Sequence, residues 1–217
     1  MDSKQIEETM CRILGPIVDP VIVEVGAYLG EDFETLLGKE MLHILIEPDP
    51  RNVVRIPRSS KRRVIQAAIA DQSGKQKFYF SDWLPAVDVH CSGSLLKPNM
   101  ENYRKHVAAM KFTEKEGEEG LVECITLDQL YAGPDIGIDG KVDLLWVDIQ
   151  GGEAGMIRGG PSALKHTRYL FMEADDVEFY EGEVLRPDLL KMLPPEWKLL
   201  EILSGNVLLE NEKFERN

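Results

Sequence analysis

One stretch decides the fold of this chain: Val21-Ile22-Val23-Glu24-Val25-Gly26-Ala27-Tyr28-Leu29-Gly30. In the first half of the stretch, apolar residues stand at both odd- and even-numbered positions. This pattern predicts a strand that is buried on both faces, as in a parallel sheet between helices. Gly26 can adopt backbone angles that other residues avoid, and Gly30 allows a helix to lie close to the strand end. The stretch therefore predicts a strand, a tight turn and a helix, the usual opening of a nucleotide site. A plainer alternative is that the glycines only turn a strand into a helix.

The residues around this turn discriminate between nucleotide ligands. A dinucleotide fingerprint needs a middle glycine so that the backbone can approach a pyrophosphate, and Tyr28 occupies that place. Glu24, Glu31 and Asp32 add negative charge, which suits a helix N-terminus but repels phosphate. These charges favour a ligand with a nucleoside at one end and a cationic amino-acid group at the other. S-adenosylmethionine (SAM) is such a ligand.

Composition and charge narrow the class of protein. With 217 residues the chain is long enough for one domain with a sizeable core. Lys and Arg total 25 against 38 Asp and Glu, and the formal charge of -13 disfavours a nucleic-acid substrate. Three widely separated cysteines indicate neither a disulfide framework nor a zinc site. Because the N-terminus lacks a secretory signal and no apolar run approaches the ~18 residues of a membrane span, we expect a cytoplasmic protein.

Apolar periodicity predicts the remaining elements. Helices are expected over residues 3–14, where the helix would cover one edge of the sheet, and over 31–38, 99–112, 153–164 and 186–193. Strands are expected over 21–25, 43–48, 64–70, 77–80, 121–125, 142–149, 169–174, 197–203 and 207–210. This order predicts an α/β fold with one doubly wound, mostly parallel seven-stranded sheet and a C-terminal antiparallel hairpin. We expect a single domain over 1–217, with a helical extension at 1–20 and a substrate-side insertion at 81–120.

Carboxylates follow two of the buried strands. Glu47 lies at the carboxyl end of 43–48, about 20 residues beyond Gly26, which matches an acid that accepts hydrogen bonds from ribose hydroxyls. Pro48 then turns the chain away from the sheet. Asp148 follows a strand that we expect beside the first, so it would face Gly26 across the crevice. For Glu47 the alternative is an exposed acid at a strand end.

Three further segments carry candidate functions. Ala68 and Ile69, at the end of the third strand, are small or apolar enough to contact an adenine ring. The basic segment 51–63 is either a solvated surface or a surface for an anionic partner. The loop 81–97 is long enough for a lid, and its His90 is either a general base or a solvated histidine.

These motifs, taken in order, resemble the FkbM family of methyltransferases, which belongs to the Rossmann-like, SAM-dependent class. The resemblance spans about residues 21 to 175 and is far more specific than any one piece. The carrying segments are 23–30, Ile46-Glu47-Pro48, 67–71 with Gly74, Ser92-Gly93-Ser94-Leu95, Thr126-Leu127-Asp128, 142–153 and Gly159. Two positions depart from the family pattern: Glu24 stands where Asp is more frequent, and Tyr28 replaces a small or polar residue.

The resemblance implies a distribution of roles around SAM. Residues 24–30 would contact the methionine end, Glu47 the ribose, and the segment after the third strand the adenine, while Asp148 and Gln150 would line the methyl-transfer face. The cofactor-binding residues expected on this basis are Glu24, Gly26, Ala27, Tyr28, Gly30, Glu47, Pro48, Ala68, Ile69, Ser94, Asp148 and Gln150.

The expected reaction is O-methylation of a hydroxyl on a small molecule, sugar or glycan. Asp148, Glu153 or His90 would orient or deprotonate that hydroxyl. We predict no metal, although Asp148 with Asp175 and Asp176 is similar to the paired acids that hold magnesium in catechol-type methyltransferases. One alternative is a catalytically silent SAM- or nucleoside-binding module. Another is a NAD-dependent oxidoreductase, which the acids near Gly26 disfavour.

Overall fold

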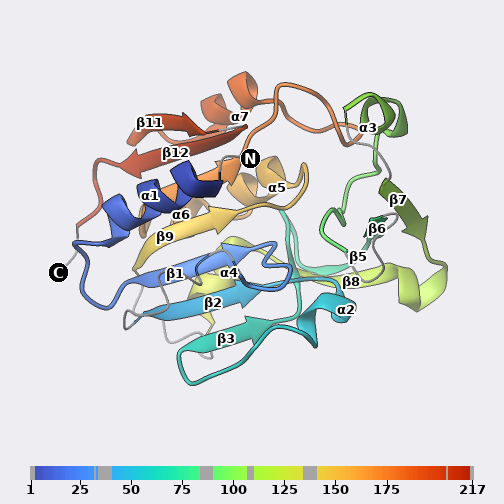
Figure 1. The fold of residues 1–217 in the computed structure, drawn as a ribbon, viewed down its shortest axis with the longest axis horizontal. Coiled ribbons are helices and arrows are strands. Elements are labelled where there is room, and N and C mark those ends of the chain that lie inside the picture. The colour runs from blue at the N-terminus through green and yellow to red at the C-terminus, as the bar shows by residue number, and fades with distance from the viewer. Residues whose placement is uncertain are drawn as a thin grey trace.

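A seven-stranded sheet organises the molecule (Figure 1). The computed structural model describes residues 3–31, 33, 41–83, 90–106, 110–133, 141–203 and 205–215. The strand order is β11-β12-β10-β9-β1-β2-β3. In this sheet β12 alone runs in the opposite direction to the other six strands, so its pairings with β10 and β11 are antiparallel. The predicted α/β sheet with a C-terminal hairpin is therefore confirmed; its strands are β1 (Val21–Val25), β2 (Leu42–Ile46), β3 (Arg62–Ile65), β9 (Val142–Val147), β10 (Thr167–Glu173), β11 (Trp197–Leu203) and β12 (Asn206–Asn211).

The centre of the sheet is buried on both faces. β1 pairs in parallel with β2 on one side and with β9 on the other, as the sequence predicts. Every residue of β9 is buried, and so are four of the five residues of β1. Because neither face of these strands is exposed to solvent, both faces are covered by helices.

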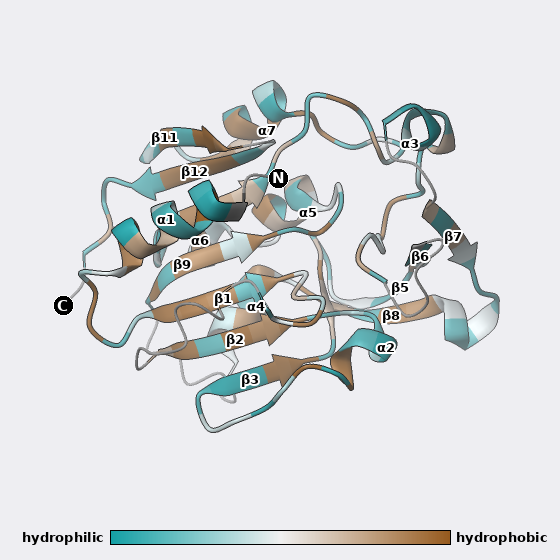
Figure 2. Cartoon of the chain, in the orientation of Figure 1, coloured by the Kyte–Doolittle hydropathy of each residue, from teal (hydrophilic) through white to brown (hydrophobic). Residues whose placement is uncertain are grey.

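Helices cover both faces of this sheet, and their apolar sides face it (Figures 1 and 2). α1 (Ser3–Leu14) packs with Ile22, Leu144 and Trp146 in one core cluster. The other face is covered by α4 (Leu127–Ala132), α5 (Glu153–Arg158), α6 (Pro161–Lys165) and α7 (Arg186–Met192). None of the helices in the described residues is long and apolar enough to cross a membrane.

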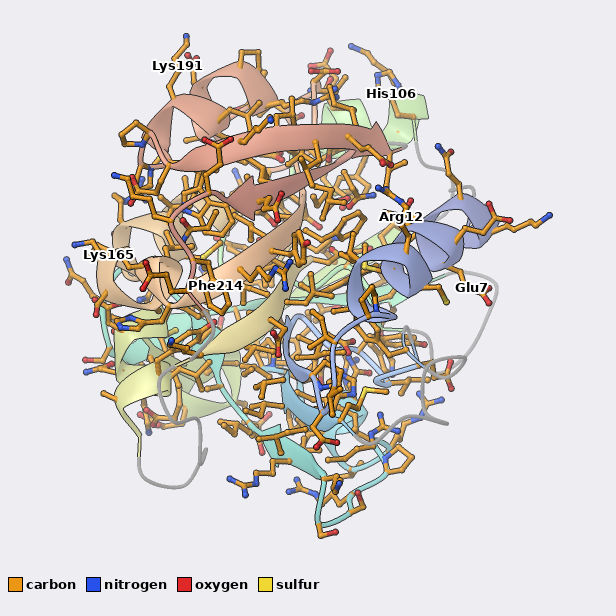
Figure 3. The ribbon with its side chains drawn as sticks, turned by 90° about the vertical axis from the view of Figure 1, so that its left-hand side faces the viewer. Glu7, Arg12, His106, Lys165, Lys191 and Phe214 are labelled. Carbon is orange, nitrogen blue, oxygen red and sulfur yellow. The ribbon has the colours of Figure 1, made fainter. Side chains whose placement is uncertain are left out.

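The helix over residues 3–14 is confirmed, but it lies on a face of the sheet rather than along an edge. Its apolar residues Ile6, Met10 and Leu14 all enter the core. Arg12 pairs with Glu201 of β11, and Figure 3 shows Arg12 toward the C-terminal strands and Glu7 projecting away from them. These residues form an apolar stripe along one side of α1, and such a stripe is buried by packing on the face of a sheet.

Two small sheets lie beyond the carboxyl ends of the main strands. One has the order β4-β8-β5, and the other pairs β6 with β7. Three short helices connect or flank these strands. The elements are α2 (Pro50–Val53), β4 (Ala68–Ile69), β5 (Gly74–Lys77), β6 (Tyr79–Trp83), α3 (Met100–His106), β7 (Met110–Glu114), the 3₁₀ helix η2 (Gly117–Gly120) and β8 (Leu121–Ile125).

The small sheets correct three predictions. The expected strand 64–70 is two strands, because the chain leaves β2 after Ile65 and pairs Ala68 with Cys124 of β8. The expected strand 77–80 is likewise divided between β5 and β6. The expected helix 99–112 ends at His106, and Phe112 lies in β7 opposite Ser81. These pairings join residues distant in sequence, which local periodicity does not reveal.

Two other helices differ from expectation or lie outside the described residues. The run 153–164 is divided between α5 and α6, because Gly159 and Gly160 end one helix and Pro161 begins the next. A Cβ on Gly159 would lie 2.3 Å from the Ala70 backbone oxygen, so the break also permits a close approach. The helix predicted over 31–38 falls almost entirely outside the described residues.

Candidate active site

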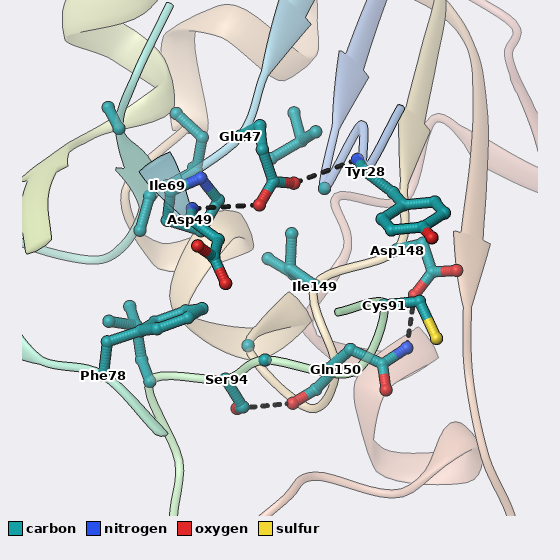
Figure 4. A pocket seen from close by; sticks show the side chains of 18 of the residues that line it. Tyr28, Glu47, Asp49, Ile69, Phe78, Cys91, Ser94, Asp148, Ile149 and Gln150 are labelled. Carbon is teal, nitrogen blue, oxygen red and sulfur yellow. Dashed lines mark hydrogen bonds between the residues drawn. The ribbon is translucent and has the colours of Figure 1, made fainter. Parts of the chain in front are cut away.

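A cavity lies over the carboxyl ends of β1, β2 and β9 (Figure 4). Ligands of open α/β sheets bind at this edge. We call its two sides the sheet-end wall and the outer wall. The sheet-end wall consists of Val25, Gly26, Tyr28, Glu47, Pro48, Asp49, Asp148, Ile149, Gln150 and Gly152. The outer wall consists of Ala67, Ala68, Ile69, Phe78, His90, Cys91, Gly93, Ser94 and Leu95.

Gly26 sets the first turn of the sheet-end wall. Its φ of 84° lies in the left-handed region that glycine tolerates. A Cβ at this position would lie 1.8 Å from the backbone oxygen of Asp148. The Asp148 amide donates to the Val25 carbonyl at 2.9 Å. The chain segments after β1 and β9 therefore approach as closely as backbones can, and only glycine fits between them.

Glu47 holds the turn after β1 through its carboxylate. Tyr28 has a φ of 47°, uncommon for an aromatic residue, and its N–H donates to Glu47 Oε2 at 2.9 Å. Oε1 accepts from the Asp49 amide at 2.9 Å and from Asn52 Nδ2 at 3.1 Å. A carboxylate offers about four acceptor positions, so among the described residues one position remains for a ligand hydroxyl.

The protonation of Glu47 depends on its burial. Only 5% of the residue is exposed, and desolvation raises its pKa to about 7. The hydrogen bonds from Asp49, Asn52 and Tyr28 oppose this shift, because they favour the ionised carboxylate. A further donor from a ligand would act in the same direction and keep the group ionised.

Apolar side chains line the cavity beside Glu47. Ala68 and Ile69 of β4 lie there, together with Phe78 and Pro48. Figure 4 shows Ile69 and Phe78 on the same side of the cavity as Asp49. A flat aromatic ligand group matches such a surface, since it gains from apolar burial and from ring packing.

Two carboxyl groups lie together where β9 and β10 end. Gln150 Nε2 donates to Asp148 Oδ1 at 2.5 Å and to Glu173 Oε2 at 3.0 Å. Burial raises the pKa of both acids, and the neighbouring charge of Asp148 raises that of Glu173 further. The pair therefore holds a proton more readily than two separate carboxyls would, because one bound proton relieves the repulsion between them.

Gln150 connects the two walls. Its φ is 57°, and its backbone oxygen accepts from Ser94 Oγ at 2.7 Å (Figure 4). Its side-chain Oε1 lies 2.8 Å from the hydroxyl of Tyr180. That hydroxyl is also 2.9 Å from the Ser92 carbonyl and 2.6 Å from the hydroxyl of Tyr103 on α3. The strained Gln150 backbone is thus held from both sides.

His90 lines the cavity from the outer wall. Its Nδ1 lies 2.9 Å from Asp82 Oδ1 and 3.2 Å from the Ser81 carbonyl. Its backbone oxygen accepts from Asn52 Nδ2 at 2.9 Å. With 11% of its side chain exposed, the residue is not the solvated loop histidine of the alternative interpretation.

The structure does not bring three predicted cofactor residues to the cavity: Glu24, Ala27 and Gly30. Glu24 is fully buried within the sheet, and its Oε2 lies 2.6 Å from His43 Nε2. Burial, reinforced by Arg62, lowers the pKa of His43 to about 3, so the contact is a hydrogen bond to a neutral imidazole. Ala27 packs instead against Leu45. The strand alternation that places Val25 at the cavity turns Glu24 away from it.

Glu153 lies behind the cavity rather than in its lining. Its Oε1 accepts from the Ile149 amide at 3.1 Å, and burial raises its pKa to about 8. It therefore supports the loop that carries Asp148. Among the acids considered for magnesium, Asp176 pairs with Arg186, and Asp148 accepts a hydrogen bond from Gln150. The described residues contain no group of three His, Cys, Asp or Glu side chains arranged to hold a metal ion.

Several lining residues have only weak signals in the sequence. Asp49 could be suggested by its position before Pro50, where it caps α2. Phe78 and Cys91 reach the cavity through the small sheets and the loop after them, and no local motif marks them. Asp82, which contacts His90, also lacks a sequence signal, whereas Glu173, which contacts Gln150, ends an apolar strand as Glu47 and Asp148 do.

A mostly parallel sheet of this order, with a glycine turn and acids over the ends of its central strands, defines a Rossmann-like protein with a cavity at that edge of the sheet. The chain belongs to the FkbM family of methyltransferases, because the model of the methyltransferase FkbM domain matches residues 24–201. It is also 31% identical over 207 residues to the 2-O-methyltransferase NoeI of Sinorhizobium fredii (strain NBRC 101917 / NGR234). That alignment covers 90% of this chain and 81% of NoeI.

Three solved structures are similar at 12% sequence identity. A putative methyltransferase from an antibiotic biosynthesis pathway of Anabaena variabilis ATCC 29413 gives a TM-score of 0.35 with 88% of this chain covered. Monomeric WbdD gives 0.46 with 96% covered, and TrmN from Thermus thermophilus gives 0.42 with 94% covered. The matched parts are 56%, 39% and 48% of those three chains, so each is considerably longer than this one.

Proposed function

We propose that this methyltransferase binds SAM in the cavity and methylates a hydroxyl oxygen of a small molecule, sugar or glycan. The observation that carries the proposal is the sheet-end wall of an FkbM-family chain, where the contacts of the described residues leave Glu47 one acceptor position next to the Gly26 turn. SAM supplies an electrophilic methyl group on a positively charged sulfur. The residues of the chain then have to bind SAM and the acceptor, orient them, and take the proton from the accepting hydroxyl.

The residues around Glu47 fit a nucleoside. Glu47 Oε2 can accept a ribose hydroxyl in addition to the Tyr28 amide. Ile69, Ala68 and Phe78 offer an apolar surface for the base, with Pro48 beside them. There is no room for a side chain at Gly26, so at this position the backbone itself forms the surface of the cavity.

Asp148 fits the cationic end of the cofactor. It belongs to a buried pair of carboxyls with Glu173, and a cationic ligand group beside the pair would favour its ionised form. Gln150 fixes its orientation through the 2.5 Å hydrogen bond, and Ser94 acts through Gln150 rather than on a ligand directly. In this assignment Asp148 binds and orients, and Glu153 supports its loop.

His90 is the residue best placed to receive a proton from the acceptor. It lies on the outer wall of the same cavity as Asp148, so the acceptor hydroxyl would enter between the two walls. Holding the two reactants in line can lower the activation barrier by roughly 7–11 kcal/mol, so the orientation of the acceptor matters more for the rate than the strength of the base. NoeI is by its name a 2-O-methyltransferase, which supports a hydroxyl oxygen as the methyl acceptor for this chain.

The first test measures the binding of SAM and of S-adenosylhomocysteine by thermal unfolding and by calorimetry. A ligand at 100 times its Kd should stabilise the folded chain by about 2.7 kcal/mol. The second test is methyl release from labelled SAM with neutral sugars, each paired with its 2-deoxy analogue. We expect transfer to a sugar and none to the analogue that lacks the accepting hydroxyl.

The outcomes separate the competing functions. No stabilisation by either SAM or S-adenosylhomocysteine would overturn the proposal. Binding without transfer to any hydroxylated acceptor would indicate a silent binding module, and saturable NAD binding would indicate an oxidoreductase. Full turnover in both Asp148→Asn and His90→Ala would reject the roles assigned to these two side chains.

A further inference from the structure

We infer that Asp82 is the positioning residue for His90: it holds the imidazole in the tautomer with the proton on Nδ1, so that Nε2 can accept the proton of the methyl acceptor. The inference rests on the proposed function for its catalytic part. Its structural part stands on the contacts of His90 alone.

The first step concerns the proton on the imidazole. Nδ1 hydrogen-bonds to the Ser81 carbonyl at 3.2 Å, and Asp82 Oδ1 lies 2.9 Å from the same nitrogen at ion-pair distance. Neither can donate, since one is a carboxylate and the other a backbone oxygen. Nδ1 therefore carries the proton, which leaves the lone pair of a neutral ring on Nε2. Among the described residues, Nε2 has no hydrogen-bond partner.

The second step concerns the fixing of Asp82. Arg51 Nη1 donates to the same Oδ1 at 2.9 Å, and Arg51 is itself bound to both carboxylate oxygens of Asp49. Ser81 and Asp82 are neighbours on β6, where they pair with Phe112 and Lys111 of β7. The carboxylate is thus held by an arginine from one segment and a strand pairing from another.

The third step relates His90 to the opposite wall. The His90 carbonyl accepts from Asn52 Nδ2, and the same nitrogen lies 3.1 Å from Glu47 Oε1. Asn52 is 1% exposed. One buried amide therefore ties the backbone of His90 to the proposed ribose-binding carboxylate. The distance between the proton acceptor and the cofactor side of the cavity is consequently set by packed groups.

The chemistry follows from this placement. The acceptor hydroxyl gives its proton to Nε2 as its oxygen bonds to the methyl carbon, and the carbon–sulfur bond breaks with its electron pair remaining on sulfur. The resulting imidazolium carries one positive charge, which Asp82 stabilises across Nδ1. Arg51, Asp49, Glu47 and Asp148 are the other acidic and basic groups of this neighbourhood, together with the neutral Cys91 thiol and Tyr28 phenol.

The test is the tautomer of His90 by ¹⁵N NMR, without cofactor or acceptor, at a pH where the ring is neutral. The chain has 4 histidines, so the His90 signals can be assigned by their loss in His90→Gln. We expect the Nδ1–H form in the wild type and a shift toward the Nε2–H form, which solvated histidines favour, in Asp82→Ala. Asp82→Glu, which keeps a carboxylate, should restore part of the original signal.

The kinetic arm separates positioning from mere stability. Asp82→Ala should lower kcat on the order of 10- to 100-fold, while the Kd of SAM and the KM of the acceptor change less than about twofold. Asp188→Ala, which removes an exposed carboxylate paired with Lys191, is the matched control and should change neither the spectrum nor kcat.

An Nε2–H tautomer in the wild type, or an unchanged spectrum in Asp82→Ala, would overturn the inference. So would a tautomer shift without a fall in kcat. Absence of turnover in the wild type would instead overturn the proposed function, and this result is recognisable because the NMR spectra do not depend on it.

Discussion

The two walls of the cavity are built in different ways. The sheet-end wall follows directly from three parallel strands, and its shape is set by backbone: a glycine against a carbonyl, and carboxylates that bind amides. The outer wall comes from two short sheets and a loop, and it is joined to the other wall by side-chain contacts at Asn52, Ser94 and Tyr180. Changes in the first wall should therefore act through the fold and cofactor binding, and changes in the second through alignment of the acceptor.

The largest expected effect is at Gly26. Gly26→Ala should lower the free energy of unfolding by about 4 kcal/mol or more and abolish SAM binding, because the added Cβ would lie 1.8 Å from the Asp148 oxygen. Urea unfolding and calorimetry measure the two quantities.

Gly74→Ala is the matched control for this change. Gly74 also has a positive φ, of 120°, but nothing lies within 4 Å of an added Cβ. It should cost only about 1–3 kcal/mol and leave SAM affinity unchanged. Equal losses in the two variants would mean that backbone strain, and not the close approach of β1 and β9, makes Gly26 necessary.

This contrast also explains how much the sequence predicts. The sheet-end wall could be foreseen, since Gly26, Glu47 and Asp148 each follow an apolar strand, and strand ends meet at one edge of a parallel sheet. Glu24 was misplaced because one residue of strand alternation decides which face a side chain takes. Of the outer wall, the sequence predicts Ala68, Ile69, His90 and Ser94. It does not predict the strand pairings that position this wall, because pairs such as Ala68 with Cys124 join residues distant in sequence.

The next effect in size concerns the protonation of Glu153 behind the sheet-end wall. Burial raises its pKa to about 8 from an ordinary value of 4.5, so the folded state holds a proton that the unfolded state loses between these values. The free energy of unfolding should fall as pH rises from about 4.5 to 8, by an amount on the order of 3 kcal/mol for this group. Denaturant unfolding at several pH values measures the slope.

Glu153→Gln should make this profile flatter, because a neutral amide can still accept from the Ile149 amide but cannot ionise. The exposed Glu123 provides a control, and Glu123→Gln should keep the wild-type slope. If Glu153→Gln keeps it too, the pH dependence originates elsewhere, for example in the acid pair of Asp148 and Glu173.

Glu47→Gln should weaken SAM binding by roughly 10- to 100-fold, since it removes a charged acceptor from the cavity. The wild type should also lose affinity as pH falls below about 7, because bound hydroxyl donors favour the ionised form of a carboxyl whose pKa burial raises to about 7. The variant should show no such loss. Calorimetric titration between pH 6 and pH 8 tests both statements, and an equal pH dependence in the two proteins would contradict the ribose role.

The smallest expected effects are at the tyrosines that tie the outer wall to Gln150. Tyr180→Phe removes the hydroxyl that contacts Gln150 Oε1 and the Ser92 carbonyl, and it should lower the free energy of unfolding by about 1–2 kcal/mol. Tyr103→Phe removes only the contact with Tyr180 and should cost about 0.5–1 kcal/mol. If the outer wall mainly aligns the acceptor, Tyr180→Phe should lower kcat more than Tyr103→Phe and leave the Kd of SAM unchanged in both. A loss of SAM affinity in Tyr180→Phe would instead mean that Gln150 transmits the change to Asp148, so that the two walls act as one unit.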